Sequence, residues 1–355
     1  MHLTLFVPDL FWPDVDNHAA FDVPGTTSLV RFLSLSEMTT TPMAATVSWE
    51  SYLTELFGFT GVTPGLALLR SRGDGLDEPG IRLCADPVNL DFVQQSLVLS
   101  PIPAQSLSAE DMAALITCLN EEFSGEGRFV SSFDPDYYAH GYFIPESNAG
   151  VLPDLAACSR LAGRRIDADE TRQILGRENL HWLNRIQMCL NEHPVNAARE
   201  AVGLPRINSL WPWGAGSLSG IPATTFATAS GHSPLLRGLC LSTGTPLQRD
   251  AVFPCTPGAH LVAELDCATA VQNDDLDAWR SATTRFDQTW ISPALAAFAA
   301  RDGKLQTLTL VSPDAHQVRR WTLQRHHLHS RTGWLKRIFG IQPTIPSLRT
   351  LVRTW

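Results

Sequence analysis

Apolar positions along the chain alternate between strand-like runs and helical stripes. Residues 3–7 (LTLFV) form a short apolar run that ends at Pro8, as expected of a buried first strand. Residues 48–57 instead place apolar side chains at helical spacing, and Gly58 follows where a C-terminal cap is expected. Because strand-like and helix-like segments keep alternating, the chain is predicted to form an α/β layered fold, with a mainly parallel sheet flanked by helices.

The remaining pattern predicts these elements in order. Strands are expected at 88–99, 128–133, 138–144, 260–264, 305–311 and 319–324. Helices are expected from Ser108 onward and over 167–192, 194–202 and 274–300. On the second of these helices, Leu180, Leu183, Ile186 and Leu190 are expected to share one buried stripe. Residues 70–80 and the uncharged stretch 207–236 are rich in Gly, Pro and Ser and are expected to be loops.

Composition supports a folded chain. Hydrophobic residues make up 44% of the 355 positions and charged residues 18%, which is enough apolar mass for a sizeable core. The first residues lack the basic and apolar regions of a secretion signal. The seven cysteines are odd in number and form no Cys-x-x-Cys pair, so reduced thiols and a cytoplasmic location are expected.

Charge is distributed unevenly between the body and the C-terminus. Residues 322–355 hold six Lys or Arg and no acid, so the rest of the chain carries 36 acids against 21 bases. An acidic body disfavours binding to nucleic acid. These facts predict a domain over 1–320 and a basic C-terminal tail over 321–355. Within that tail, residues 333–340 (GWLKRIFG) are amphipathic, and either a weak membrane or partner contact through 325–355 or docking on the acidic body is expected.

The most unusual passage is HPVNAAREAVGLPRINSLWPWGAG, residues 193–216. It resembles the RpfE-type regulatory protein family, whose members are described as cofactor-independent phosphoglycerate mutase-like. The resemblance extends to the archaeal-type cofactor-independent phosphoglycerate mutases of the alkaline phosphatase superfamily. Their Asn-x-x-Trp-x-Trp-Gly element is matched by Asn208, Trp211, Trp213 and Gly214. Weaker matches to the family occur in the same order along the chain, at 53–59, 68–90, 234–244 and 275–295.

The resemblance implies an alkaline phosphatase-like fold in which Asp and His side chains hold two metals beside a Ser nucleophile. Carried over position by position, the metal ligands would be Asp9, Asp266, Asp314 and His316. The pattern departs from the family in several places. The nucleophile position falls on Trp49, Leu10 stands where a Gly is expected, and Ala315 separates the last Asp from its His. No catalytic residue is therefore assigned, and no cofactor is expected unless an intact metal site holds Mn or Zn.

Several residues are candidates for binding a ligand. A Gly-rich loop brings backbone amides near a ligand and an indole offers a flat wall, whereas Arg and His can contact an anion. The alternative for each is a packing or capping role. The candidates are His193, Arg199, Asn208, Trp211, Trp213 and Arg237.

The sequence therefore predicts a non-catalytic regulatory or binding protein that resembles a phosphoglycerate mutase. Its expected partner is an unidentified protein or a phosphorylated small molecule. The alternative is a metal-dependent phosphomutase or phosphatase with rearranged metal ligands. A third hypothesis is an interaction protein that makes its contact through the basic tail.

Overall fold

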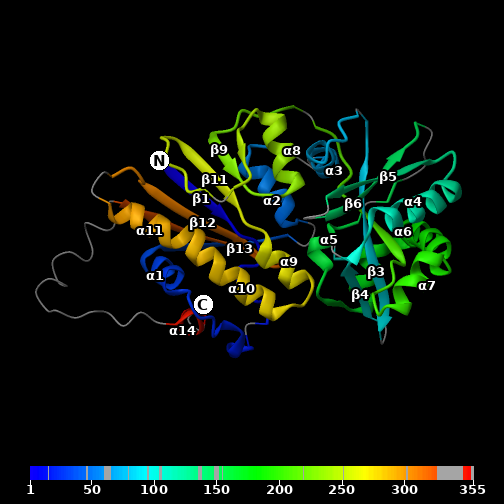
Figure 1. The fold of residues 1–355 in the computed structure, drawn as a ribbon, viewed down its shortest axis with the longest axis horizontal. Helices are drawn as coiled ribbons and strands as arrows, with labels where there is room; N and C mark the ends of the chain where they lie inside the picture. Colours follow the sequence, from blue (N-terminus) through cyan, green and yellow to red (C-terminus); the bar gives the residue numbers. More distant parts are fainter. Residues whose placement is uncertain are drawn as a thin grey trace, which may run out of the picture. The chain divides into compact units, whose positions relative to one another are not determined.

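The computed structural model divides the chain into two compact units. Unit 1 comprises Met1–Ala45, Thr224–Ser233 and Gly244–Trp355, and unit 2 comprises Thr46–Ala223 and Pro234–Thr243. The structure describes residues 1–14, 16–44, 47–59, 65–78, 80–93, 96–103, 106–134, 138–147, 152–153, 155–218, 220–250, 252–300, 303–325 and 347–352. Each unit is built around its own sheet (Figure 1).

Unit 1 contains a seven-stranded sheet in the order β10-β9-β11-β1-β12-β13-β2. The five strands from β10 to β12 are parallel, and β13 and β2 add two antiparallel pairings at one edge. The predicted α/β class with a mainly parallel sheet is therefore confirmed. The strands are β1 (His2–Phe6), β2 (Glu37–Pro42), β9 (Phe226–Ser230), β10 (Leu247–Gln248), β11 (Ala259–Ala263), β12 (Thr307–Pro313) and β13 (Gln317–Gln324).

Helices of unit 1 pack their apolar faces on this sheet. The core joins Leu3 and Leu5 of β1 to Trp279, Phe286 and other apolar side chains of the helices. These helices are η1 (His18–Phe21), α1 (Thr27–Leu35), α9 (Asp266–Gln272), α10 (Leu276–Phe286), η3 (Asp287–Ile291), α11 (Ser292–Ala299) and α14 (Leu348–Val352). The predicted helix over 274–300 is thus confirmed, although η3 interrupts it with one π-helical turn.

Unit 2 contains an antiparallel sheet that the sequence pattern did not predict. Its strands follow the order β5-β6-β3-β4-β7, and β8 pairs with β3. They are β3 (Leu83–Val93), β4 (Ser96–Pro101), β5 (Gly127–Asp134), β6 (Tyr138–Pro145), β7 (Arg165–Ile166) and β8 (Ser209–Trp213). The helices are α2 (Trp49–Leu56), α3 (Leu66–Gly73), α4 (Ala109–Glu122), α5 (Cys158–Leu161), α6 (Ala168–Asn191), α7 (Pro194–Ala201) and α8 (Pro234–Thr243).

Two predicted loops are wrong in part. The stretch 70–80 includes the last turn of α3, and 207–236 contains β8, β9 and the start of α8. Two of their Gly and Pro residues serve packing rather than turns. Gly73 lets α3 approach α8, since a Cβ there would collide with the carbonyl of Pro234, and Pro212 lies within β8 opposite Ala85.

Other predictions needed smaller changes. The single strand expected at 88–99 is a hairpin of β3 and β4. Leu180 is exposed although Leu183, Ile186 and Leu190 are buried, because its helical angle places it at the edge of the stripe. Helix α4 begins as predicted, with the Ser108 side chain accepting the Asp111 N–H at 3.0 Å.

The cysteines differ from expectation at one pair. Cys118 of α4 and Cys189 of α6 form a disulfide, whereas reduced thiols were expected throughout. The other five cysteines are free, and four of them are buried. The pairing depends on α4 and α6 meeting in space, which the sequence separation of 71 residues hides.

The C-terminal region is described only in part. Strand β13 runs across position 320. The division into a 1–320 domain and a 321–355 tail stays a prediction. Helix α14 packs within unit 1, with Leu348 buried in its core. The amphipathic segment 333–340 lies outside the described residues. Among the helices that are described, none combines the length and apolar character needed to cross a bilayer.

Candidate functional site

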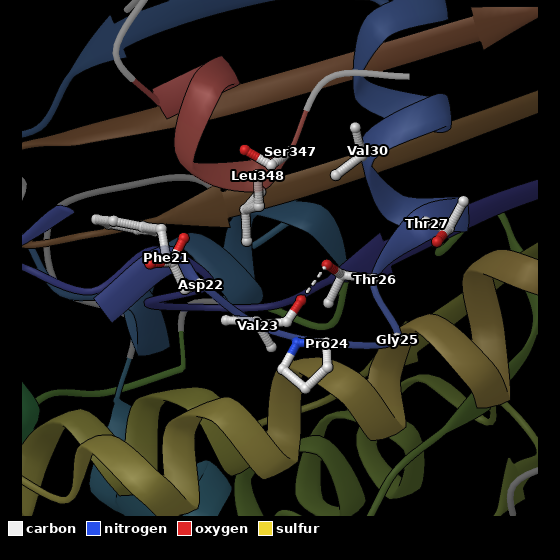
Figure 2. A pocket seen from close by; sticks show the side chains of 10 residues that line it. All are labelled: Phe21, Asp22, Val23, Pro24, Gly25, Thr26, Thr27, Val30, Ser347 and Leu348. Carbon is white, nitrogen blue, oxygen red and sulfur yellow. Dashed lines mark hydrogen bonds between the residues drawn. The ribbon is translucent and has the colours of Figure 1, made fainter. Parts of the chain in front are cut away.

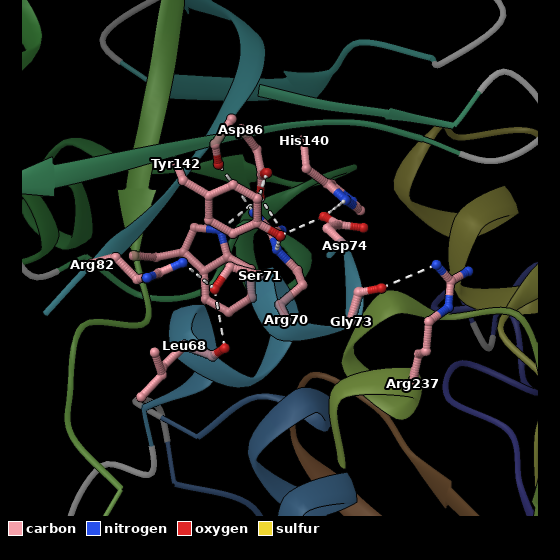
Figure 3. Close-up of polar contacts among 12 residues, drawn as sticks. Leu68, Arg70, Ser71, Gly73, Asp74, Arg82, Asp86, His140, Tyr142 and Arg237 are labelled. Atoms are coloured by element: carbon pink, nitrogen blue, oxygen red, sulfur yellow. Dashed lines mark hydrogen bonds and ion pairs between the residues drawn. The ribbon is translucent and has the colours of Figure 1, made fainter. Parts of the chain in front are cut away.

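A buried ion pair lies at the centre of unit 2. Arg70, on the last turns of α3, holds both carboxylate oxygens of Asp86 on β3 at 2.9 and 2.7 Å (Figure 3). Only 8% of the Arg70 side chain and 15% of the Asp86 side chain are exposed. The indole of Trp213 donates to the same carboxylate at 2.7 Å. One tryptophan of the Trp-Pro-Trp block therefore belongs to a buried polar network.

The network continues from Arg70 toward Asp74 and His140. Arg70 Nε donates to the Tyr142 hydroxyl at 3.1 Å, and that hydroxyl donates to Asp74 Oδ2 at 2.5 Å. The His140 ring reaches the same Asp74 oxygen through Nδ1 at 3.0 Å. Arg70 also lies over the rings of Tyr142 and Trp213, 4.9 and 5.2 Å from their centroids. Strands β3, β6 and β8 thus meet around one guanidinium.

Burial and charge set the protonation of this network. Burial acts to raise the pKa of Asp86, but the charge and hydrogen bonds of Arg70 outweigh it and leave the pKa below its usual value. Burial likewise opposes ionisation of Asp74, yet its hydrogen bonds from His140 and Tyr142 lower the pKa overall. The charge of Asp86 raises the pKa of Arg70 although burial acts against it. Both carboxylates are therefore ionised at neutral pH.

A second buried acid lies near the network. Glu50 of α2 is 6% exposed and accepts a hydrogen bond from Ser159 Oγ at 2.7 Å. Burial raises the pKa of Glu50, and its hydrogen bonds with serine only partly offset that effect. The sequence pattern did not single out Glu50, Arg70, Asp74, Asp86 or His140 individually. Arg70, Asp74 and Asp86 fall within the resembling segment 68–90, which was the available signal.

The arrangement is well suited to stabilising the sheet and poorly suited to binding an anion. Arg70 donates to Asp86, to Tyr142 and, at 3.3 Å, to the Gly141 carbonyl. A phosphate would have to displace these partners within a buried site, which costs the desolvation of each group left unpaired. The network therefore positions β3, β6 and β8 rather than offering donors to a ligand.

Most of the predicted ligand-binding residues use their polar groups within the chain. The Asn208 amide pairs with both backbone groups of Leu90, and the Trp211 indole donates to the Ala156 carbonyl at 2.9 Å. Trp211 is fully buried. These two candidates, together with Trp213, lie on or next to β8 and attach it to its neighbours.

The two candidates on α7 have similar local roles. The His193 ring accepts the Val195 N–H at 3.3 Å and so caps the start of the helix. Arg199 is buried and donates to the carbonyls of Pro205 and Ser106. The alternative of capping and packing, which the sequence left open, therefore describes what these side chains contact.

Arg237 of α8 differs from the other five candidates. One of its terminal nitrogens donates to the Gly73 carbonyl at 3.0 Å, at the C-terminal end of α3 (Figure 3). Its Nε is buried and has no hydrogen-bond partner among the described residues. Arg237 therefore retains a donor that the protein does not use.

The predicted metal ligands follow neighbouring strands of unit 1. Asp9 follows β1, Asp266 follows β11 and Asp314 follows β12, so all three lie at the carboxyl edge of the parallel sheet. Asp266 forms an ion pair with Arg285, and Asp314 forms one with Arg319 at 2.8 Å.

His316 is exposed, and its backbone N–H donates to Asp314 Oδ1 at 2.8 Å. Across the described residues, no three His, Cys, Asp or Glu side chains are grouped as a metal site would require. As placed, the side chains do not fit the two-metal site that the resemblance implies. Trp49, at the expected nucleophile position, is the first residue of α2.

Glu264 is an acid at the same edge that the sequence did not single out. It directly follows β11, and burial together with the charge of Asp266 raises its pKa to about 7. The nearby Trp290 indole acts in the opposite direction. Its position at a strand end was the signal available in the sequence.

Comparisons with known proteins give distant structural similarity. No protein-family model matches the chain, and no curated protein matches it. The PH0037 protein from Pyrococcus horikoshii matches with 13% identity and a TM-score of 0.49, over 91% of this chain and 87% of its own. A cofactor-independent phosphoglycerate mutase from Thermoplasma acidophilum DSM 1728 matches with 16% identity and a TM-score of 0.39, over 99% of each chain.

Proposed function

We propose that this chain is a non-catalytic binding or regulatory protein, related to the RpfE-type, phosphoglycerate mutase-like proteins that its Trp-Pro-Trp block resembles. One observation carries the proposal. The carboxylates of Asp266 and Asp314, which the resemblance assigns to metal, are each paired with an arginine. The supporting observation is that Trp49 stands at the nucleophile position.

The arginines at this edge oppose the binding of a metal cation. A divalent cation at this edge would have to compete with guanidinium groups that already neutralise its ligands, and it would be repelled by them. In-line phosphoryl transfer between two metals needs several anionic ligands and an activated nucleophile. The arginine partners of Asp266 and Asp314, together with Trp49 at the nucleophile position, support a chain that lacks both.

The experiment measures metal and turnover together. We expect purified chain, dialysed against Mn²⁺ and Zn²⁺, to retain less than one equivalent of metal by elemental analysis and to leave 3-phosphoglycerate and nitrophenyl phosphate unconverted. The double variant Arg285→Ala/Arg319→Ala releases both carboxylates and should retain more Mn²⁺ than the unaltered chain. Two equivalents of metal with turnover in the unaltered chain would overturn the proposal.

A phosphorylated small molecule is the ligand that we propose for this protein. Arg237 supports that choice because its buried Nε finds no hydrogen-bond partner in the part of the chain that the structure describes. We expect 3-phosphoglycerate to raise the melting temperature of the unaltered chain, because a ligand that binds only the folded state stabilises it. Arg237→Gln should abolish the shift, whereas Arg177→Gln, at an exposed position of α6, should not. A shift that survives Arg237→Gln would exclude this site.

The competing function is a metal-dependent phosphomutase or phosphatase with rearranged ligands, binding Mn or Zn. Two observations favour it. Glu264 lies beside Asp266, whose charge contributes to its raised pKa. The pKa of the Cys267 thiol is raised to about 12 by burial and, to a smaller extent, by the charges of Glu264, Asp266 and Asp9. Metal retention that Glu264→Gln abolishes would select this alternative. The cytoplasmic location and the absence of nucleic-acid binding stay predictions from the sequence.

A further inference from the structure

A pocket in unit 1 lies beside the C-terminal helix α14. It has a volume of about 490 Å³ and lies between residues 21–30 and the start of α14 (Figure 2). Phe21, Val23, Val30 and Leu348 supply apolar walls. In Figure 2, Leu348 points from α14 toward the turn that carries Val23 and Thr26. The pocket is therefore an unfilled space beside the contact that Leu348 of α14 makes with this turn.

The wall opposite α14 is firmly held. The Thr26 hydroxyl donates to the Val23 carbonyl at 2.9 Å, and the Thr284 hydroxyl of α10 donates to the Pro24 carbonyl at 3.0 Å. Arg280 of the same helix donates to the carbonyls of Ala19 and Ala20. This wall is preformed, as binding grooves usually are.

The pocket is not arranged for an anion. The backbone N–H of Leu29 at the start of α1 already donates to the buried carboxylate of Asp287. The charged side chain that lines the pocket is Asp22, an acid. The groove therefore favours an apolar occupant that brings a positive charge to Asp22.

Helix α14 meets that description and is short. It has five residues, and isolated helices of this length are not stable on their own. Leu348 is buried, and Leu351 and Val352 pack against the core of unit 1. The side chains of Arg349 and Asp22 form an ion pair at 3.0 Å that is roughly half exposed on both sides, so solvent screens it and it contributes little.

We propose that the groove formed by η1, the turn at 22–26 and α1 is an exchangeable docking site for a basic amphipathic helix of a protein partner, with α14 as its resident competitor. The partner helix presents a bulky apolar side chain to the pocket, and a Lys or Arg at the next position pairs with Asp22. In α14, Leu348 and Arg349 show the same pattern on a shorter helix. This goes beyond the proposed function, since it names a surface and a partner chemistry in unit 1.

The test uses a fluorescein-labelled peptide with the sequence of residues 347–355, SLRTLVRTW, and fluorescence anisotropy. We expect saturable binding to the full chain and binding about tenfold tighter or more to a chain ending at residue 346, because a tethered competitor acts at millimolar effective concentration. A peptide with Leu348→Phe should bind more tightly than the parent peptide, since it fills the pocket.

Charge reversal makes the assignment specific. The peptide with Arg349→Glu should bind the unaltered chain several-fold more weakly, because it brings a like charge to Asp22, and the protein variant Asp22→Lys should restore its affinity. Asp250→Lys, an exposed acid of the same unit, is the matched control and should leave binding of both peptides unchanged.

Two outcomes would overturn the proposal: equal affinity for the full and the shortened chain, or binding that is indifferent to the charge at Asp22. Should the shortened chain fail to fold by circular dichroism, the full-length variant Arg349→Glu replaces it. That variant weakens α14 in place, and it must then bind the parent peptide more tightly than the unaltered chain does.

Discussion

Arg70 shows how one side chain can connect three strands. Its guanidinium is held by Asp86 on β3 and by Tyr142 and Gly141 on β6, and it lies over Trp213 of β8. A buried charge of this kind is tolerated because it is paired and its donors are occupied. Removing one partner leaves the other charge buried without compensation.

We expect Asp86→Asn to lower the free energy of unfolding by about 3–5 kcal/mol, because Arg70 would remain charged in a buried site. Urea denaturation followed by circular dichroism measures the change. Asp169→Asn breaks the exposed ion pair with Arg172 and is the matched control, with an expected loss of about 0–1 kcal/mol. Equal losses in the two variants would contradict a buried, compensated pair.

Glu264 gives unit 1 a pH dependence of known sign. Its pKa is about 7 in the folded chain and near the ordinary 4.5 when unfolded, so the folded state binds the extra proton between these values. Stability from this group is complete below about pH 4.5 and is lost as the pH rises through 7. The shift corresponds to a loss of about 3 kcal/mol at most.

Glu264→Gln should remove this contribution, so the unaltered chain should lose more stability between pH 5 and 8 than the variant does. Denaturant unfolding across that range measures the difference. Glu110→Gln, at an exposed position of α4, is the control. Parallel pH profiles for the unaltered chain and Glu264→Gln would show that Glu264 titrates normally.

The sequence identified several of the important residues but not the side chains that they contact. It singled out Trp213 and two candidate metal ligands, Asp266 and Asp314. It did not show that Trp213 would donate to Asp86, 127 positions away, or that arginines would pair with both acids. Such contacts depend on how distant elements meet, which no local pattern records.

At the level of elements, helices α3 and α8 approach unusually closely. A Cβ at Gly73 would collide with the Pro234 carbonyl, and one at Gly238 would collide with the Leu69 carbonyl. Both obstacles are backbone atoms, so a larger residue forces the helices apart. The sequence reading treated Gly73 as a turn residue, because a glycine that permits close packing looks the same in sequence.

We expect Gly73→Ala and Gly238→Ala each to destabilise the chain by about 1–3 kcal/mol or more through overpacking. Thermal unfolding measures the loss. Gly220→Ala is the control, because a Cβ there meets nothing within 4 Å. A neutral result at both helix positions would mean that α3 and α8 separate easily.

The disulfide between α4 and α6 offers another test at this scale. Cross-linking residues 118 and 189 restricts the unfolded chain, which for this loop length corresponds to about 4 kcal/mol in the chain-entropy treatment. The double variant Cys118→Ser/Cys189→Ser should lower the denaturation midpoint, and Cys255→Ser, at an exposed free cysteine, should not. Added reductant should then leave the double variant unaffected.

For most elements the pattern was sufficient. Helix α4 was predicted from its N-cap and apolar stripe, and β1, β11 and β12 from apolar runs, because such signals are local. The antiparallel sheet of unit 2 was not predicted as such. Its β3–β8 pairing joins strands far apart in sequence, and the Pro in β8 suggested a loop.

At the scale of the whole molecule, each unit is assembled from separate pieces of chain. Unit 2 takes residues 46–223 and then α8, whereas β9 before α8 and β10 after it belong to unit 1. We therefore expect α8 to share its stability with α3 rather than with the strands next to it in sequence.

Hydrogen exchange at low denaturant tests this. Amides of α3 and α8 should open together, and Gly238→Ala should speed exchange in both while leaving β9 and β11 unchanged. Faster exchange in β9 and β11 by the same factor would show instead that the two units unfold as one.

The order of these pieces along the chain also bears on how the protein is made. A ribosome that has released residues 46–223 has released every strand of the unit 2 sheet, but α8 is still to come. The face of α3 that carries Gly73 therefore lacks its contact with α8 until residue 243 emerges. By then β9 of unit 1 has already been synthesised. During synthesis, unit 2 therefore completes its packing only after the chain has begun to return to unit 1.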